Sequence, residues 1–500
     1  MTSNWRGMRL ATTVLVMVIS LTMLTWAMGT VAASPAGGCA TLRVPSQYPT
    51  IQGAINAAHP CDTILVAPGT YIGQLTIDKS INLVGSGAWS TIVQGPAVVT
   101  PDAFGSPWMI ELGAGATVSI TGVTVLVTLQ CIIGPGPSGV LYAGGGIGVG
   151  GSAYLNLQSA VVTTTGGTEG AACGGPSPTT SGTLSYGDGI AFGLDYVVGS
   201  PSASALIGSG QVTGVTISGF GYSGEAIGIG GHVDSAAGSS ATISYDKLTI
   251  SSDATGDYSL LDVGGSLEPC SATIVHSVLM SSPEVTPNDI TVAGGSSVYV
   301  AYNSILAGWA GIGVAVAGSS ATILYNSIIG PTSTFGETGV GVFEGGTATV
   351  SYNTIGQFEC AYDPALLEAG VCGPNYLTQY QLAGIWLDGS GTVAATNNLI
   401  YATDAGFLMV DGCSPNCVVQ NNVITNSYDY GLAGIDGSYS IGPNLIIGGA
   451  YGVAAIAYSV DTAVTLSHVV MVGPTVAPLY YEVDFTGGTA TITGTWTVLQ

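Results

Sequence analysis

Four acidic residues recur close to glycine turns in the C-terminal half of this 500-residue chain. They are Glu344, Asp388, Asp411 and Asp436. Carboxylate oxygens are the ligands that calcium prefers in proteins, so one interpretation is a calcium site. The alternatives are acids that extend into water, or acids that are protonated in an acidic habitat and hydrogen-bond to one another. If their segments stack as strands about 4.8 Å apart, the four residues are expected to form one column.

A second pair of acids, Asp188 and Asp195, lies in the segment YGDGIAFGLDY and is the candidate for catalysis. Two carboxylates are sufficient to hydrolyse a glycosidic bond. Acids near a turn are more often simply solvated, and nothing beyond acid pairs supports catalysis here. We therefore favour a non-catalytic protein and keep hydrolysis of a neutral sugar as the alternative.

Aromatic residues gather in the segment GQFECAYDPALLEAGVCGPNYLTQYQ, which interrupts an internal repeat. It contains Tyr362, Tyr376 and Tyr380, and Trp386 begins the strand that follows. Loops that protrude from a rigid scaffold often carry function. We take these four aromatic residues as candidates for binding a sugar. Packing of the rings on the underlying repeat is the alternative, and the more common case.

The repeat that carries these residues begins near residue 226. Copies such as GIGVAVAGSSATILYNSIIG and GVGVFEGGTATVSYNTIG contain three short strands, a glycine turn and an Asn. The Asn residues are Asn303, Asn326, Asn353, Asn398 and Asn422. Such a period indicates a solenoid, and three alternating strands per period leave no space for a helix. The chain is thus expected to form a parallel β-helix, with Asn at one left-handed corner of each coil and its amides hydrogen-bonded along the column.

The first coil is expected to be covered by a helix in YPTIQGAINAA, because Ile51, Ala54, Ile55 and Ala58 share one face. The strand DTILVAPGTY and the segment LTIDKSINLVGSG follow. This region resembles the N-terminal cap and first coil of the right-handed parallel β-helix superfamily, which has the pectin lyase-like fold. SYNTI and YNSII resemble the generic repeat of that group, which includes pectin-active enzymes and NosD-like proteins.

The resemblance implies an all-β, right-handed parallel β-helix solenoid with a short N-terminal capping helix. We expect one domain over residues 34–500, with loop insertions at about 130–187 and 356–381. Pectate lyases and pectin methylesterases of this fold use an arginine, and polygalacturonases have a basic motif after their clustered Asp residues. This chain has no arginine after Arg43 and no such motif. We therefore expect it not to cleave polygalacturonate by elimination.

The N-terminus reads as a targeting segment, because Arg6 and Arg9 precede a long apolar run that ends in small residues. A signal peptide over 1–33 with cleavage after Ala33 predicts a secreted or cell-surface protein, and an uncleaved anchor is the alternative. The formal net charge of −24 excludes nucleic acid as a partner, since almost no basic residue is present to neutralise phosphates. The shortage of basic residues favours the acidic habitat, in which stability falls as pH rises.

Nine cysteines in an exported chain suggest disulfides. The expected neighbours are Cys39 with Cys61, Cys131 with Cys173, Cys360 with Cys372, and Cys413 with Cys417, and Cys270 is left without an assigned partner.

Taken together, these patterns predict an exported scaffold or binding protein, with a carbohydrate or a cell-envelope component as its partner. The segment TATITGTWTVLQ has no evident capping helix, so self-association through the C-terminal coil is a further alternative. No cofactor is expected other than the calcium considered above.

Overall fold

The computed structural model describes residues 38–500 except for 101–107, 129–131, 134–140, 143–144, 165–183, 186–187, 194–206, 221–224, 231–237, 251–258, 265–268, 282–287, 309–311, 332–337, 359–382, 413–416 and 485–486. The chain divides into the units Met1–Ala40 and Thr41–Gln500, and the fold below is that of the second unit. The expected signal segment lies outside the described residues, so its cleavage stays a prediction. Across the described part of the chain, no helical segment combines the length and the hydropathy of a membrane span.

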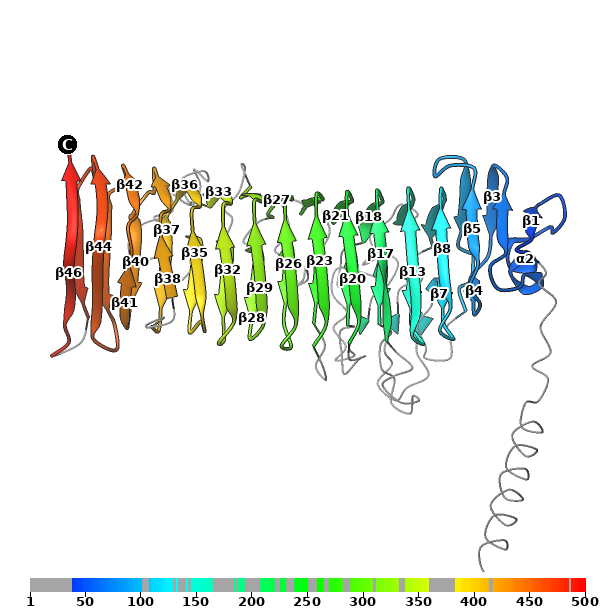
Figure 1. The fold of residues 1–500 in the computed structure, drawn as a ribbon, viewed down its shortest axis with the longest axis horizontal. Coiled ribbons are helices and arrows are strands. Elements are labelled where there is room, and N and C mark those ends of the chain that lie inside the picture. Colours follow the sequence, from blue (N-terminus) through cyan, green and yellow to red (C-terminus); the bar gives the residue numbers. More distant parts are fainter. Residues whose placement is uncertain are drawn as a thin grey trace, which may run out of the picture. The chain divides into compact units, whose positions relative to one another are not determined.

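Three stacks of parallel strands make up this unit, and successive strands of a stack come from successive coils of the chain (Figure 1). The first stack contains β1 (Thr41–Val44), β2 (Thr63–Val66), β5 (Asn82–Gly85), β8 (Thr117–Thr121), β13 (Ala153–Gln158), β17 (Gly208–Thr213), β20 (Ser240–Ser244), β23 (Ser271–Val275), β26 (Ser297–Ala301), β29 (Ser320–Leu324), β32 (Thr347–Ser351), β35 (Val393–Thr396), β38 (Cys417–Gln420) and β41 (Ser438–Ile441).

The second stack contains β3 (Gly69–Ile72), β6 (Thr91–Gln94), β9 (Thr124–Val127), β14 (Val161–Thr164), β18 (Thr216–Phe220), β21 (Lys247–Ile250), β24 (Val278–Met280), β27 (Ser304–Leu306), β30 (Ser327–Ile329), β33 (Thr354–Phe358), β36 (Leu399–Thr403), β39 (Val423–Thr425) and β42 (Leu445–Ile447). The long strand β44 (Thr462–Val472) continues both of these stacks, and β46 (Ala490–Leu499) pairs with it.

The third stack contains β4 (Leu75–Ile77), β7 (Trp108–Leu112), β12 (Gly145–Val149), β16 (Ile190–Phe192), β19 (Ile227–Ile229), β22 (Leu261–Val263), β25 (Ile290–Val292), β28 (Ile312–Ala317), β31 (Thr338–Phe343), β34 (Ala383–Asp388), β37 (Ala405–Val410), β40 (Tyr430–Ile435), β43 (Tyr451–Ala457) and β45 (Ala477–Val483). Three short strands, β10 (Ile132–Ile133), β11 (Leu141–Tyr142) and β15 (Leu184–Ser185), form a separate small sheet.

Side chains alternate between the inside of the coils and the outer faces, as the strand period requires. In β29, Ala321 and Ile323 are buried and their neighbours are at least partly exposed, and β20 repeats this pattern with Ala241 and Ile243. The inward residues of successive coils join into one continuous apolar core. The arrangement confirms the predicted all-β solenoid of parallel coils.

The helix α2 (Ile51–Ala57) caps the first coil, as predicted. Its residues Ile51, Ala54 and Ile55 are buried and belong to the same core as the strands. The hydroxyl of Thr50 accepts a hydrogen bond from the backbone N–H of Gly53 at 3.0 Å and so caps the N-terminus of the helix. The short helix is therefore fixed by its apolar face and by its N-cap.

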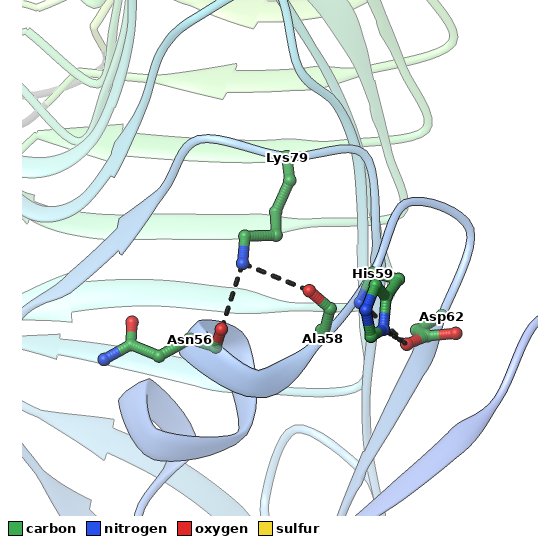
Figure 2. A network of polar contacts seen from close by, with 5 residues as sticks. All are labelled: Asn56, Ala58, His59, Asp62 and Lys79. Carbon is green, nitrogen blue, oxygen red and sulfur yellow. Dashed lines mark hydrogen bonds and ion pairs between the residues drawn. The ribbon is translucent and has the colours of Figure 1, made fainter. Parts of the chain in front are cut away.

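Two polar side chains tie α2 to the coil that follows. The ammonium group of Lys79 donates to the backbone carbonyls of Asn56 and Ala58, both at 3.1 Å, and so satisfies the C-terminal end of the helix (Figure 2). The amide of Gln52 accepts from the backbone N–H of Thr76 at 2.9 Å and donates to its carbonyl at 3.2 Å. Gln52 thus bonds to both backbone groups of a residue in the edge strand β4.

Disulfides are present at three of the described cysteines. Cys39 and Cys61 are both disulfide-bonded, in agreement with the predicted bond between them. Cys417 is also disulfide-bonded, whereas its predicted partner Cys413 lies outside the described residues. Cys270 is a buried thiol, and burial raises its pKa. The other predicted pairs, Cys131 with Cys173 and Cys360 with Cys372, fall outside the described residues.

An asparagine ladder runs along the corner between the first and second stacks. The backbone N–H and the side-chain Nδ2 of Asn353 both donate to Oδ1 of Asn398 in the next coil, at 3.0 and 3.1 Å. Nδ2 of Asn353 also donates to the carbonyl of Ile323 at 2.9 Å. The same inter-coil bonds link Asn303, Asn326, Asn353, Asn398, Asn422 and Asn444, all of which are buried. The predicted column of amides is confirmed and extends to Asn444.

The left-handed backbone predicted for these asparagines lies one residue earlier. Tyr352 and Asn397 both have φ of 58°, and they directly precede the ladder residues Asn353 and Asn398. The prediction was wrong in this detail because the corner uses two residues. A left-handed residue turns the chain and keeps its own side chain outside, and the next residue places its amide inside.

The ladder position holds other residue types in the coils toward the N-terminus. Ser277 donates its N–H to Oδ1 of Asn303 at 2.8 Å, and Asp246 donates its N–H to the hydroxyl of Ser277 at 3.2 Å. Oδ1 of Asp246 in turn accepts the N–H of Val215 at 2.6 Å. Burial raises the pKa of Asp246 to about 7, although hydrogen bonds from the N–H groups of Val215 and Ser244 lower it. One rung of the ladder is therefore a titratable group.

Two other buried acids also have raised pKa values. Asp289 is fully buried, and its Oδ1 accepts a hydrogen bond from the hydroxyl of Ser281 at 2.7 Å. Burial raises the pKa of Asp289 well above its usual range. Burial also raises the pKa of Asp429 to about 6. These carboxyl groups favour the folded state while they are neutral.

We expect Asn398→Ala to lower the free energy of unfolding by about 2–4 kcal/mol, because it removes the acceptor of the buried backbone N–H of Asn353 and the side-chain donor to the carbonyl of Val350. Thermal unfolding followed by circular dichroism measures the loss. The matched control is Asn397→Gly, the exposed neighbour, which should change stability by less than about 0.5 kcal/mol. Equal losses in the two variants would show that the ladder contributes nothing beyond the corner itself.

The buried acids predict that the melting temperature falls between about pH 4 and pH 8. Their folded-state pKa values are raised above the unfolded value of about 3.9, so their contribution is complete below that value. It is lost as pH rises through about 6 for Asp429 and about 7 for Asp246. Asp246→Asn should flatten this fall and melt above the wild type at pH 8, since it removes a titrating rung.

The control for that variant is Ser277→Asn, which changes the adjacent rung but removes no carboxyl group. The melting temperature of this variant should fall with pH as steeply as that of the wild type. A wild-type melting temperature that rises from pH 5 to pH 8 would contradict the assignment of neutral buried acids.

Candidate functional site

The four acids of the predicted column do not share one register. Asp388 pairs in the third stack with Phe343 and Val410, so it is a strand residue. Glu344 and Asp411 follow those two strand residues and lie at left-handed corners, with φ of 52° and 55°. The prediction of one column was therefore wrong. In the coil of Asp388, the next residue (a glycine with φ of 51°) takes the corner instead.

The fourth acid, Asp436, lies at the same left-handed corner position as Glu344 and Asp411, with φ of 48°, and it also caps a turn. Its carboxylate accepts the N–H groups of Tyr458 at 2.7 Å, Ser459 at 3.0 Å and Val460 at 3.3 Å, and the hydroxyl of Ser459 at 2.8 Å. Burial alone would raise the pKa of Asp436, but these hydrogen bonds outweigh it and lower the pKa. By contrast, burial and then the charge of Asp411 raise the pKa of Asp388.

Within the described residues, no group of three or more histidine, cysteine or acidic side chains is placed to hold a metal ion. Three of the four acids, Glu344, Asp411 and Asp436, occupy one corner position in their coils, and Asp388 lies one residue earlier in its strand.

Trp386 lies on the outer face of the third stack and is only 9% exposed. Its ring meets that of Phe343 edge to face, with centroids 4.4 Å apart, in an apolar cluster that also contains Leu408 and Tyr430. This placement favours packing over the predicted role in sugar binding. The other predicted aromatic residues, Tyr362, Tyr376 and Tyr380, lie outside the described residues.

Asp188 has an acidic neighbour that the sequence did not indicate. Both Asp188 and Glu225 are buried, and Oδ1 of Asp188 accepts the backbone N–H of Glu225 at 3.1 Å. A Cβ atom on Gly228 would lie 2.8 Å from Oδ2 of Asp188 and 2.9 Å from Oε2 of Glu225. Glycine at this position therefore leaves space for both carboxylates. Asp195, the predicted partner of Asp188, lies outside the described residues.

The outer face of the first stack carries a groove of about 440 Å³ that crosses β13, β17, β20, β23 and β26. Its hydroxyl groups form two columns, because these strands pair in strict parallel register. One column contains Ser209, Ser240, Ser271 and Ser297, and the other contains Thr242 and Thr273. The volume falls in the range of ligand pockets.

The six hydroxyls of these two columns bond to no other protein group in the described part of the structure. A neighbouring column on the same face behaves differently, since the hydroxyls of Thr213 and Ser244 lie 3.1 Å apart and bond across the coils. The hydroxyls in the groove are therefore available to a ligand.

Two tyrosines bound the groove. Tyr154 comes from β13 at one end, and Tyr299 from β26 at the other, where it is 38% exposed and continues the threonine column. The lining contains no acidic or basic side chain. Groove residues therefore offer hydroxyl groups and two aromatic rings, and no fixed charge.

A stack of exposed aromatic rings follows the corner beside the groove. Tyr245, His276, Tyr302, Tyr325 and Tyr352 occupy the left-handed position in successive coils. Their ring centroids are 5.0–5.1 Å apart and their planes differ by at most 11°. Because each inner ring is covered on both faces by its neighbours, the stack offers mainly ring edges to a ligand.

A short repeated segment in the sequence marks the groove, in addition to the asparagine spacing. The segment Ser-Ala-Thr-Ile occurs at 240–243, 271–274 and 320–323, and its Ser and Thr both point outward. The aromatic stack likewise corresponds to the tyrosine that precedes Asn303, Asn326 and Asn353. Glu225 had no such signal, since it lies 37 residues from Asp188 in the sequence.

The comparison with protein families agrees with this architecture. Residues 266–446 match the family model of the right-handed β-helix region. Among curated proteins, none matches the chain in sequence. The solved structures similar to it include the catalytic unit of a thermostable α-1,3-glucanase from Streptomyces thermodiastaticus, with 15% identity, 94% of this chain and 69% of that chain covered, and a TM-score of 0.43.

A second similar structure is the A-module of a mannuronan C-5 epimerase from Azotobacter vinelandii, with 14% identity, coverage of 90% and 94%, and a TM-score of 0.35. The third is the Dettilon tailspike protein, with 12% identity, coverage of 73% and 59%, and a TM-score of 0.38. At these identities the likeness concerns the fold alone. With the matched repeat region, the stacked parallel coils and the capping helix, this chain is a right-handed parallel β-helix protein.

Proposed function

We propose that this protein is an exported, non-catalytic β-helix that binds a carbohydrate in the groove of the first stack. The observation that carries the proposal is a set of six unpartnered hydroxyls between two tyrosine rings, those of Ser209, Ser240, Thr242, Ser271, Thr273 and Ser297. Hydroxyl groups hydrogen-bond to sugar hydroxyls, and aromatic rings pack against the apolar faces of sugars.

Export is part of this proposal. Disulfide-bonded cysteines are typical of oxidising compartments, and Cys39, Cys61 and Cys417 are disulfide-bonded. The N-terminal apolar run agrees with the same location. A location outside the cell would expose the groove to polysaccharides of the surroundings or of the cell envelope.

Glycan-array binding followed by titration tests the proposed function. We expect Tyr154→Ala and Tyr299→Ala each to weaken binding of the glycan found by about tenfold, because each removes one stacking ring. The matched control is Tyr481→Ala, a tyrosine that is 49% exposed and far from the groove along the chain. Binding that survives both groove variants unchanged, or a complete lack of glycan binding, would contradict the proposal.

A second candidate is the hydrolysis of a neutral glycan, and the convergence of Asp188 and Glu225 beside Gly228 favours it. Two carboxylates can serve as acid and as base or nucleophile. Their low exposure, 5% and 3%, restricts access of a substrate and makes this the weaker candidate.

Release of reducing ends from neutral polysaccharides tests the second candidate. If it is correct, Asp188→Asn and Glu225→Gln should each lower the rate by at least about 100-fold, while Tyr481→Ala keeps it. No product from the wild-type protein, or equal rates in the acid variants, would eliminate hydrolysis and leave the binding proposal intact.

Self-association is a third proposal and rests on the last coil. Within the described residues, β45 pairs only with β43, and β46 only with β44, so each has an unpaired edge. Such edges can add a further strand. Trp496, Val498 and Leu499 of β46 are each at least 37% exposed, which adds apolar surface at the same place.

A further inference from the structure

The groove runs along the direction in which the coils stack, and this direction bears on the shape of its ligand. Its five strands belong to five successive coils, and parallel strands lie about 4.8 Å apart. Tyr154 and Tyr299 are therefore roughly 19 Å apart along the stacking direction. Between the two tyrosines, serines repeat in four successive coils and threonines in two, so a ligand that repeats at the same interval would meet equivalent serines along the groove.

We propose that the groove binds an extended, neutral β-1,4-linked glycan that lies parallel to the stacking direction, with about one sugar per coil. This inference rests on the proposed carbohydrate-binding function and names its ligand class. A β-1,4-linked pyranose chain is extended and advances by about one ring length per sugar, which is close to the spacing of the coils. An α-1,4-linked chain curves, so its successive sugars leave the line of the two columns.

Charge supports the neutral class. The groove lining has no basic side chain, and the whole chain has 29 acidic against 5 basic residues. An anionic glycan would therefore find no counter-charge in the groove and would be repelled by the protein as a whole. A neutral chain meets only hydroxyl groups, small floor residues such as Ala241 and Ala272, and the two terminal rings.

The test is calorimetric titration of the protein with cello-oligosaccharides of two to seven sugars. We expect affinity to rise at least tenfold from the disaccharide to about five sugars, one for each strand of the groove, and then to stay constant. Malto-oligosaccharides of equal length should bind at least tenfold more weakly. Cello-oligosaccharides oxidised to uronic acids should also bind at least tenfold more weakly at low salt, with a smaller difference at high salt.

Two tyrosine substitutions, one inside the groove and one outside it, test the path of the ligand. Ser271→Tyr places a ring in the middle of the serine column and should remove the advantage of the longer oligosaccharides, so that they bind like the disaccharide. Thr347→Tyr changes the same column beyond Tyr299, outside the groove, and should leave the length dependence intact.

The outcomes separate this inference from the proposed function. Three results would contradict an axial β-1,4-linked ligand. They are affinity that does not depend on oligosaccharide length, equal binding of malto-oligosaccharides, and loss of the length dependence in both Ser271→Tyr and Thr347→Tyr. If cello-oligosaccharides fail but another glycan binds in a Tyr154-dependent manner, the ligand class is wrong and the site stands. If no glycan binds, or if Tyr154→Ala and Tyr299→Ala both bind with the affinity of the wild type, the proposed function is wrong and the inference is wrong with it.

Discussion

Parallel pairing in strict register between successive coils is the constraint on which the rest of this molecule depends. A residue at one position of a coil lies beside the residue at the same position of the next coil, about 4.8 Å away. Where the same residue type recurs in successive coils, its side chains must therefore pack against one another. Amides, aromatic rings and hydroxyls do so, and they form the columns at Asn398, Tyr325 and Ser271. Repeated charges repel at this distance, which is a physical reason for so few charged residues in the chain.

Much of the fold could be predicted from the sequence because these columns leave a periodic signal. The spacing of the asparagines indicated the coils, and the apolar face of Ile51, Ala54 and Ile55 indicated the cap. The site was less predictable. Alignment on the turn glycine placed Asp388 in a column with Asp411, whereas the corner itself is taken by the glycine. Glycine can be the corner residue or the residue after it, and the sequence alone does not distinguish the two cases.

The outer faces of the coils differ in chemistry although the same chain builds them. On the third stack, the outward residues near Trp386 are apolar and buried, and those near Asp188 are acidic and buried. On the first stack, outward hydroxyls such as Thr242 and Thr273 are open and unpartnered. Burial thus separates residues that stabilise the molecule from residues that can meet a ligand. Asp436 and Asp246 also belong to the stabilising group. The carboxylate of Asp436 accepts hydrogen bonds from a turn, and that of Asp246 accepts hydrogen bonds within the ladder.

The aromatic stack gives one part of the molecule an optical signature of its own. Parallel chromophores 5.0–5.1 Å apart couple their electronic transitions, which isolated tyrosines do not. The rings belong to the coils from β20 to β33. A solenoid can lose order in one group of coils while others keep it, since each coil contacts only its neighbours. The coupled-tyrosine component of the circular dichroism spectrum would therefore report the middle coils, while the far-ultraviolet signal follows every strand. A difference between the two unfolding curves would reveal whether the middle coils lose order before the others.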